Sequence, residues 1–494
     1  CHYPHLNPVW FETMELHPED PVQWASLHFA EAELGDARRV KRAEGMAAAM
    51  LRAPGESLPR LFVHPREVKA AYRFLDNPHV DPEGLQAGHR QRVREAMQAP
   101  GTYLLIEDSS EFSYSGRQPV GGLGFIGNAR EGLQGFVLHS VLAVRWWGKT
   151  DTGKRKRPGV EVLGVAGQSY RVRREKRGRG KESSTRRKHR PRESEGWIHS
   201  GDRLGSPPPD PRVRWVRVAD RGADLYELLA RCRELGQGFV IRAAQDRGLV
   251  DPRGGKGVGR LFPALRAEAS RGSFELGLRG RGSRPARVAR LQVSALRVHL
   301  VAPQRPGHAR GGLSPVACTA LRVWEESPPE GVGVEPLEWV LLTDQGVGSF
   351  AQAEEVVQQY ATRWLIEEFH KALKTGLGAE RLQLERAERI FAAVALMSVV
   401  ATRLLALREW VRLIPEAPAE HGGLAAPELE VLRGYTHQPL RTVGEVALAL
   451  GRLGGHQGRK GDGMPGWLTL WRGMARLQTL VEGVRLARKI KTYG

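Results

Sequence analysis

The sequence predicts an α/β protein in which a mixed sheet is flanked by helices, a β-rich domain is inserted late in the chain, and both ends are helical. Three observations predict this class. Short apolar runs that end in acidic residues, typical of buried strands, occur at 103–108 and 213–220. Helical periodicity dominates residues 14–80 and most of the chain after residue 351. Residues 245–345 are rich in Gly, Pro and Arg and hold short alternating stretches, which favours strands and turns.

Size and charge narrow the class of protein. The chain has 494 residues, of which 41% are hydrophobic, so it is globular and long enough for about two to four domains. Its net charge of +20 favours a polyanionic partner, above all nucleic acid. The longest apolar run, 390–401, is too short to span a membrane and fits a core helix. Cys1, Cys232 and Cys318 are far apart and form no zinc motif, which fits a reducing cytoplasm.

The first predicted domain is helical and binds DNA. Residues 1–13 show no periodicity, so we expect a non-native or disordered leader and a true start near Met14. The domain covers 14–80, and Gly35 and Asp36 separate its first two helices. Three arginines on the second helix are candidate DNA contacts: Arg38, Arg39 and Arg42. A basic helix after a turn suits a DNA backbone or groove, whereas a solvated basic face is the alternative.

Two acidic residues close predicted strands. Asp108 ends the run 103–108, and Asp220 ends the run 213–220. We expect another strand of the same sheet at 136–147. A helix at 225–235 and a strand at 238–242 follow Asp220, and the last residue of that strand, Arg242, is a further candidate DNA contact.

A basic arm is predicted between these strands, over residues 149–210. Twelve cations and two glutamates lie between Arg171 and Arg192, and no apolar period survives there. Such a segment is expected to be disordered without a partner and to contact phosphates without regard to sequence. Gly254–Gly259 superficially resembles a phosphate-binding loop but lacks the Ser or Thr that must follow Gly-Lys, so we interpret it as a hairpin tip.

The most informative segment is 360–374, which we predict to be one helix. At 100° per residue, four side chains lie within roughly 60° of one face: Tyr360, Arg363, Glu367 and Lys374. A carboxylate flanked by cations suits a phosphodiester held at a metal centre. A helix stabilised by Glu–Lys pairs is the alternative.

Two further carboxylates favour a metal centre over a helix stabilised by Glu–Lys pairs. These are Asp108 and Asp220, which we group with Glu367. Mg²⁺ takes oxygen ligands, and two such ions about 3.5–4 Å apart serve phosphoryl transfer. Three carboxylates suffice to hold the pair, with Asp108 bridging both ions. We therefore predict that these three acids are the metal ligands and the catalytic residues.

These residues carry a resemblance to bacterial cut-and-paste transposases of the DDE class, in the insertion-sequence-four family. The most specific signal is the Tyr-x2-Arg-x3-Glu-x6-Lys spacing of residues 360–374, and the match extends from about Gln23 nearly to the end. Further matching segments are 34–39, 71–74, 106–110, 139–142, 220–224, 339–343 and 466–471. Gly222 departs from the family, which has Glu there, and the basic arm departs from a more acidic stretch.

The resemblance implies a ribonuclease-H-like catalytic domain over 81–411 and a helical dimerisation and synapsis domain over 412–494. It implies that Asp108, Asp220 and Glu367 are catalytic and bind Mg²⁺, for which Mn²⁺ can substitute. It also implies three phosphate contacts and one base contact: Tyr360, Arg363, Lys374, and Trp339 stacked on a flipped base. The alternative for Trp339 is a buried core residue.

The implied activity is DNA transposition. A homodimer would nick the inverted-repeat ends of a transposon, form and open a hairpin, and transfer the freed strand to target DNA, in a bacterial cytoplasm at the nucleoid. Two alternatives remain: a ribonuclease-H-like nuclease or resolvase without strand transfer, and a catalytically inert DNA-binding relative.

Overall fold

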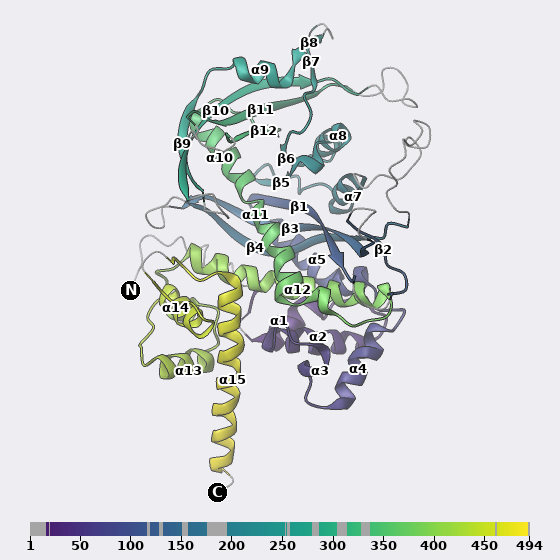
Figure 1. The fold of residues 1–494 in the computed structure, drawn as a ribbon, viewed down its shortest axis with the longest axis vertical. Coiled ribbons are helices and arrows are strands. Elements are labelled where there is room, and N and C mark those ends of the chain that lie inside the picture. Colours follow the sequence, from purple (N-terminus) through teal and green to yellow (C-terminus); the bar gives the residue numbers. More distant parts are fainter. Residues whose placement is uncertain are drawn as a thin grey trace. The chain divides into compact units, whose positions relative to one another are not determined.

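The computed structural model describes residues 16–18, 20–115, 119–127, 132–150, 157–174, 195–251, 253, 257–278, 286–303, 314–327, 336–459 and 462–492. The chain forms two compact units (Figure 1). The first comprises Cys1–Ala99, Ser109–Lys181 and Leu365–Gly494, and the second comprises Pro100–Asp108 and Glu182–Trp364. The predicted leader 1–13, most of the arm's cations, and the centre of the predicted 254–259 hairpin tip lie outside the described residues.

The first unit begins with five helices: α1 (Pro21–Phe29), α2 (Ala37–Arg52), α3 (Leu58–Leu61), α4 (Pro65–Leu75) and α5 (Pro82–Ala96). Their starts follow from local chemistry. The Asp20 carboxylate caps α1 by accepting the backbone N–H groups of Val22 and Gln23, and Asp36 caps α2. Gly35 has a φ of 67°, a left-handed conformation that favours glycine and ends the preceding turn.

The strands of the first unit are the second half of β1 (Gly101–Ser113), β2 (Gly124–Phe125), β3 (Gln134–Thr150) and β4 (Arg157–Arg171). β3 lies between β1 and the antiparallel strands β2 and β4. α12 (Ala387–Leu413) packs on β4. Among the described helices, α12 alone is long and apolar enough to cross a membrane, but 72% of its most apolar window is buried inside the structure. It is therefore the core helix that the sequence predicts.

The remaining helices of this unit follow one another towards its end. They are α11 (Trp364–Lys371), of which all but Trp364 belongs here, the π-turn η4 (Ala372–Gly376), η5 (Ala379–Arg381), η6 (Ala419–His421), α13 (Ala426–Thr436), α14 (Val443–Leu453) and α15 (Trp467–Thr492). The last three pack with the end of α12 around one apolar cluster.

The second unit contains a mixed sheet in the order β1-β5-β6-β12-β11-β10-β7-β8, with β9 also paired to β10. Its strands after β1 are β5 (Val213–Ala219), β6 (Gly238–Arg242), β7 (Gly248–Val250), β8 (Gly257–Arg260), β9 (Gly272–Leu278), β10 (Arg287–Leu300), β11 (Val316–Glu325) and β12 (Glu338–Thr343). β1, β5 and β6 are parallel, whereas β12, β11 and β10 continue antiparallel.

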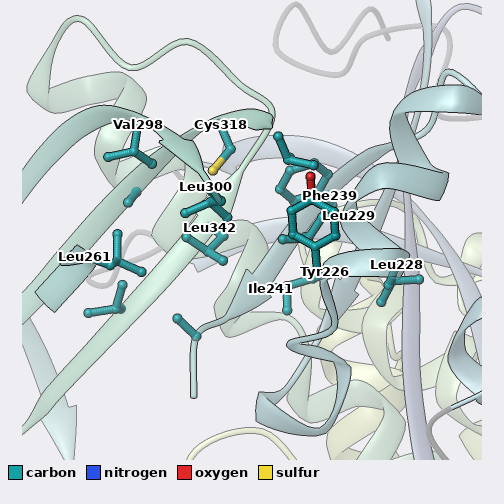
Figure 2. Close-up of a cluster of buried hydrophobic side chains, with 14 of the residues drawn as sticks. Tyr226, Leu228, Leu229, Phe239, Ile241, Leu261, Val298, Leu300, Cys318 and Leu342 are labelled. Atoms are coloured by element: carbon teal, nitrogen blue, oxygen red, sulfur yellow. The ribbon is translucent and has the colours of Figure 1, made fainter. Parts of the chain in front are cut away.

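Helices α7 (Glu195–Leu204), α8 (Tyr226–Glu234), α9 (Leu261–Ala267) and α10 (Phe350–Ala361) and the turn η3 (Arg221–Ala223) complete the second unit. A core of aliphatic and aromatic side chains lies between α8, α9 and the sheet, including Leu229, Phe239, Leu261 and Leu342 (Figure 2). The mixed sheet with flanking helices confirms the predicted α/β class.

Two predicted elements differ from the structure. Strand β4 and helix α7 lie inside the range 149–210 that the composition assigns to an arm. β4 is held in the core by three buried valines, Val160, Val162 and Val165. The many charged residues that follow made this short apolar stretch hard to recognise as a strand in the sequence. Strand β1 also continues to Ser113, because Phe112 is fully buried beyond the acidic residues, so Asp108 does not end the strand.

Candidate active site

Asp108 and Asp220 lie side by side in the second unit. The parallel pairing of β1 with β5 runs in register from Gly101 opposite Val213 to Glu107 opposite Ala219. Asp108 is the next residue of β1, and Asp220 directly follows the last residue of β5. Because paired residues in a parallel sheet point to the same face and neighbouring strands are about 4.8 Å apart, both carboxylates emerge on one face next to each other. The structure thus brings together the two acids that end the paired region.

The Asp220 carboxylate is fixed by the turn that follows it. Its Oδ1 accepts the Gly222 N–H at 2.7 Å, and Asp220 caps η3. Gly222 is the position that departs from the family pattern. A Cβ there would lie 3.0 Å from Asp220 Oδ1, so glycine leaves the carboxylate more room than a larger residue would.

Arg363 forms an ion pair with Asp108. Its Nη1 lies 3.3 Å from Asp108 Oδ2, and the two side chains are 19% and 23% exposed. The guanidinium offsets part of the negative charge of two adjacent carboxylates, which would otherwise repel each other. The structure thus pairs Arg363 with Asp108, whereas the sequence analysis grouped it with Glu367 on one helical face.

A buried ion pair supports the register of the two acidic strands. Arg217 of β5 donates from Nε to Glu107 Oε1 at 2.5 Å and from Nη2 to Glu107 Oε2 at 2.8 Å. Ser200 of α7 adds a hydrogen bond to the same carboxylate at 2.8 Å. The two charged side chains are 1% and 0% exposed. Successive side chains of a strand point to opposite faces, so Glu107 lies on the face of the sheet opposite Asp108. The Glu107–Arg217 pair therefore joins β1 and β5 from that opposite face.

The Glu107–Arg217 pair is the functional feature that sequence reasoning missed. The only signal was an arginine inside the otherwise apolar run 213–219 together with an acid beside Asp108. Nothing in the sequence shows that the two face each other.

The prediction of one continuous helix over 360–374 is wrong. α10 ends at Ala361, and the Thr362 hydroxyl donates to the Gln359 carbonyl at 2.6 Å, which satisfies a terminal acceptor locally. α11 begins at Trp364, and after Lys371 the chain widens into the π-turn η4. The single helical face calculated from 100° steps therefore does not exist. Tyr360 lies in the last turn of α10, and Arg363 lies between the two helices.

Glu367 and Lys374 belong to the first unit. Glu367 is exposed in the first turn of α11, whereas Leu365, Ile366 and Phe369 are buried. Lys374 donates to the Glu111 carbonyl and lies 4.9 Å from the centre of the Phe112 ring. Burial lowers the pKa of Lys374, although Glu380 and Glu111 oppose the shift. The π-turn thus aims this lysine at β1.

The other candidate DNA contacts are on several elements. Trp339 of β12 is half-buried opposite the core residue Val323, and its Nε1 is shielded from water without a hydrogen-bond partner among the described residues. Arg242 is half-buried in β6. The three arginines of α2 differ in exposure: Arg38 is 92% exposed beside Asp36, Arg39 donates to the Leu34 carbonyl, and Arg42 is half-buried.

The described ranges contain no group of three or more His, Cys, Asp or Glu side chains arranged to hold a metal ion. Asp108 and Asp220 would supply hard oxygen ligands, the kind that Mg²⁺ prefers, so their donor chemistry fits such an ion. Glu367 belongs to the other unit, and its contribution is part of the proposal below.

A ribonuclease-H-like sheet with paired aspartates at adjacent parallel strands defines an enzyme that acts on polynucleotides. Three family models match this chain: transposase DNA-binding at residues 21–80, transposase DDE domain at 212–403, and transposase Tn5 dimerisation domain at 431–494. The chain belongs to the DDE transposases of the Tn5 kind, which is consistent with the insertion-sequence-four family. It is a DNA transposase with DNA as its partner and a homodimeric assembly, and DDE domains of this class use divalent metal ions.

Proposed function

We propose that Asp108, Asp220 and Glu367 form one catalytic centre that excises DNA at inverted-repeat ends and joins it to a target. The observation that carries this proposal is the parallel pairing of β1 with β5, whose register ends with Glu107 opposite Ala219, the residues that immediately precede Asp108 and Asp220. The DDE domain model matches residues 212–403, a range that contains Asp220 and Glu367, which supports their place in one catalytic domain, whereas Asp108 precedes the matched range.

The three acids would hold two Mg²⁺ ions, with Mn²⁺ as a substitute. Bound ions of this kind neutralise charge and lower the pKa of water at a phosphodiester. Asp108 is the best bridge, because its carboxylate lies beside Asp220 on one side and Arg363 on the other.

The other residues position the DNA. Arg363 is already oriented by Asp108 and would hold a phosphate bidentately, as guanidinium groups do. Tyr360 and Lys374 would contact neighbouring phosphates. Trp339 would stack on a flipped base, which offsets part of the few kcal/mol that unstacking costs. Arg38, Arg39, Arg42 and Arg242 would contribute contacts along the backbone.

The reaction would proceed in four steps at this one centre. Water first nicks the transposon end and frees a 3′-hydroxyl, which attacks the opposite strand to form a hairpin. A second water opens the hairpin, and the 3′-hydroxyl then attacks target DNA. Each step is an in-line displacement at phosphorus, so one acid set serves all four. The dimer would pair two ends in a synapse, in the bacterial cytoplasm at the nucleoid.

The test is an in vitro reaction of purified protein with labelled end DNA, Mg²⁺ and a supercoiled target plasmid. The end DNA is taken from the inverted repeats that flank the gene. The parent should give nicks, hairpins and joined products, whereas Asp108→Asn, Asp220→Asn and Glu367→Gln should bind the ends but not nick them. Cleavage without any joined product would instead identify a nuclease or resolvase. Cleavage by Glu367→Gln at the parent rate would remove Glu367 from the mechanism.

A further inference from the structure

Glu368, the residue after Glu367, is held from two sides. The Trp467 indole N–H donates to Glu368 Oε2, and Arg408 Nη1 donates to the same oxygen at 3.2 Å. Trp467 is the first residue of α15, and Arg408 lies on α12. Both donors are 3% exposed, whereas the Glu368 side chain is 27% exposed, so the donors are held in the core and meet the carboxylate at its edge.

The arginine of this cluster is itself fixed. Arg408 Nε donates to Glu409 Oε1 at 2.6 Å, and Arg412 Nη1 donates to that oxygen at 3.0 Å. Glu409 is buried like Arg408. The guanidinium therefore presents a fixed donor to Glu368 instead of following it, and the Glu368 carboxylate is anchored to α12.

α15 also contacts the chain beyond the end of α11. A Cβ on Gly376, the last residue of the π-turn η4, would overlap the ring of Trp471 and press on that of Trp467. The turn that carries Lys374 thus packs directly against two indoles of α15, whose ring centres are 5.9 Å apart. α15 contacts Glu368 in the middle of α11 and Gly376 beyond its end.

The matched dimerisation domain, 431–494, includes α15. We propose that Trp467, Glu368 and Arg408, here called the Glu368 clasp, set the position of α11 and so couple the dimerisation domain to the carboxylate of Glu367. This inference rests on the catalytic role proposed for Glu367. Trp467 and Arg408 are positioning residues, because they act on Glu367 only through its neighbour.

The geometry of α11 makes such a clasp effective. The helix has eight residues, about two turns, so its own hydrogen bonds resist rotation weakly. Its buried side chains face the core, and Glu367 is exposed. A rotation of the helix would displace that carboxylate, and a misplacement of about 1 Å can slow a reaction about a hundredfold.

The test compares two Trp→Phe substitutions in the full-length dimer. Trp467→Phe keeps an aromatic ring and removes the N–H that reaches Glu368. Trp471→Phe is the matched control, because the Trp471 Nε1 has no hydrogen-bond partner in the described part of the chain and packs on the same glycine. Three quantities are measured: dimerisation by sedimentation, affinity for end DNA by gel shift, and the single-turnover rate of nicking as a function of Mg²⁺ concentration.

Trp467→Phe should nick about tenfold more slowly and need more Mg²⁺ for half-maximal rate, with dimerisation and DNA affinity within about twofold of the parent. Amides of 365–371 should exchange hydrogen faster than in the parent, which is a readout independent of activity. Trp471→Phe should match the parent in rate and exchange. Glu368→Gln, which keeps an acceptor for the indole but loses the charge that Arg408 meets, should give a smaller loss of the same kind.

Parent-like nicking and parent-like exchange in Trp467→Phe would overturn the coupling. Equal losses of dimerisation and nicking would also overturn it, because the clasp would then act in assembly alone. Failure of the proposed function would look different, since the parent would not nick end DNA or Glu367→Gln would nick normally. If Trp467→Phe does not fold, the Glu368→Gln variant tests the same coupling, because it weakens the contact with Arg408.

Discussion

Arg363 shows how much a single residue can organise at the candidate site. Its guanidinium is within 3.3 Å of Asp108 and lies between two short helices, not on the face of a long one. The helical spacing grouped Arg363 with Glu367 on one face, but the helix is interrupted at Thr362 and Arg363 instead pairs with Asp108. This pairing joins residues 255 positions apart, so no local pattern could predict it.

Trp339 carries the residue-scale prediction. Its ring is half-buried, and its Nε1 makes no hydrogen bond among the described residues. Under the proposed function, this ring stacks on a flipped base. Trp339→Ala should slow hairpin formation about tenfold or more relative to first nicking, because stacking is worth about 1–3 kcal/mol per base. Trp339→Phe should recover most of the loss.

The measurement is the ratio of hairpin to nicked product over time in a single-turnover assay. A ratio unchanged by Trp339→Ala would assign this tryptophan to the core instead of the DNA.

At the scale of elements, the two acidic strands depend on a register that the sequence could not reveal. The strands at 213–220 and 238–242 and the helix at 225–235 were predictable, because apolar runs and turn residues delimit them. The contact between Glu107 and Arg217 was not predictable, because it joins two residues that lie 110 positions apart in the sequence. The break at Thr362 was also hidden, since it depends on a hydroxyl that bonds a carbonyl in place of a continued helix.

The buried Glu107–Arg217 pair gives the element-scale prediction. Arg217→Met leaves a buried carboxylate unpaired, so it should lower the free energy of opening of β5 by about 3–5 kcal/mol. The double change Glu107→Gln with Arg217→Met should recover most of that loss. Native-state hydrogen exchange of residues 213–219 measures these values.

A matched control is available on the same unit. Arg212 pairs with Asp210 at 2.7 Å but is 73% exposed, so Arg212→Met should leave the same free energy almost unchanged. Equal effects of the two arginine changes would show that the buried pair does not hold the register.

At the scale of a whole unit, a chain of buried histidines joins the N-terminal helices to the sheet. The Val165 N–H donates to His89 Nε2 at 2.9 Å, so the His89 Nδ1–H donates to His28 Nδ1 at 3.0 Å, and His28 Nε2 in turn donates to the Leu16 carbonyl at 2.8 Å. His17 donates to the Val162 carbonyl of β4 at 2.9 Å. Each ring is neutral in this network, because a second proton would find no acceptor.

These histidines predict acid lability. Burial lowers the pKa of His17 to about 4 and that of His28 to about 3, from an ordinary value of 6.5, and it lowers the pKa of His89 as well. The unfolded chain therefore takes up protons first as the pH falls below 6.5. The stability that these neutral histidines contribute is therefore fully present above pH 6.5 and should be lost progressively as the pH falls towards about 4.

Thermal unfolding of the first unit between pH 7.5 and 5 checks this expectation. His79→Ala, at an exposed histidine, should leave the pH dependence unchanged. A flat stability curve from pH 7 to 5 would contradict the neutral network. No local motif marks these histidines in the sequence, because several of their contacts join residues 61 to 145 positions apart.

The central claim is that Asp108, Asp220 and Glu367 share one metal centre. Fe²⁺ in place of Mg²⁺, with ascorbate and peroxide, produces radicals that cut the backbone next to the bound ion. With end DNA bound, the account predicts cuts near residues 108, 220 and 367 together, and their joint loss in Asp108→Asn. Cuts near 108 and 220 with none near 367 would contradict it.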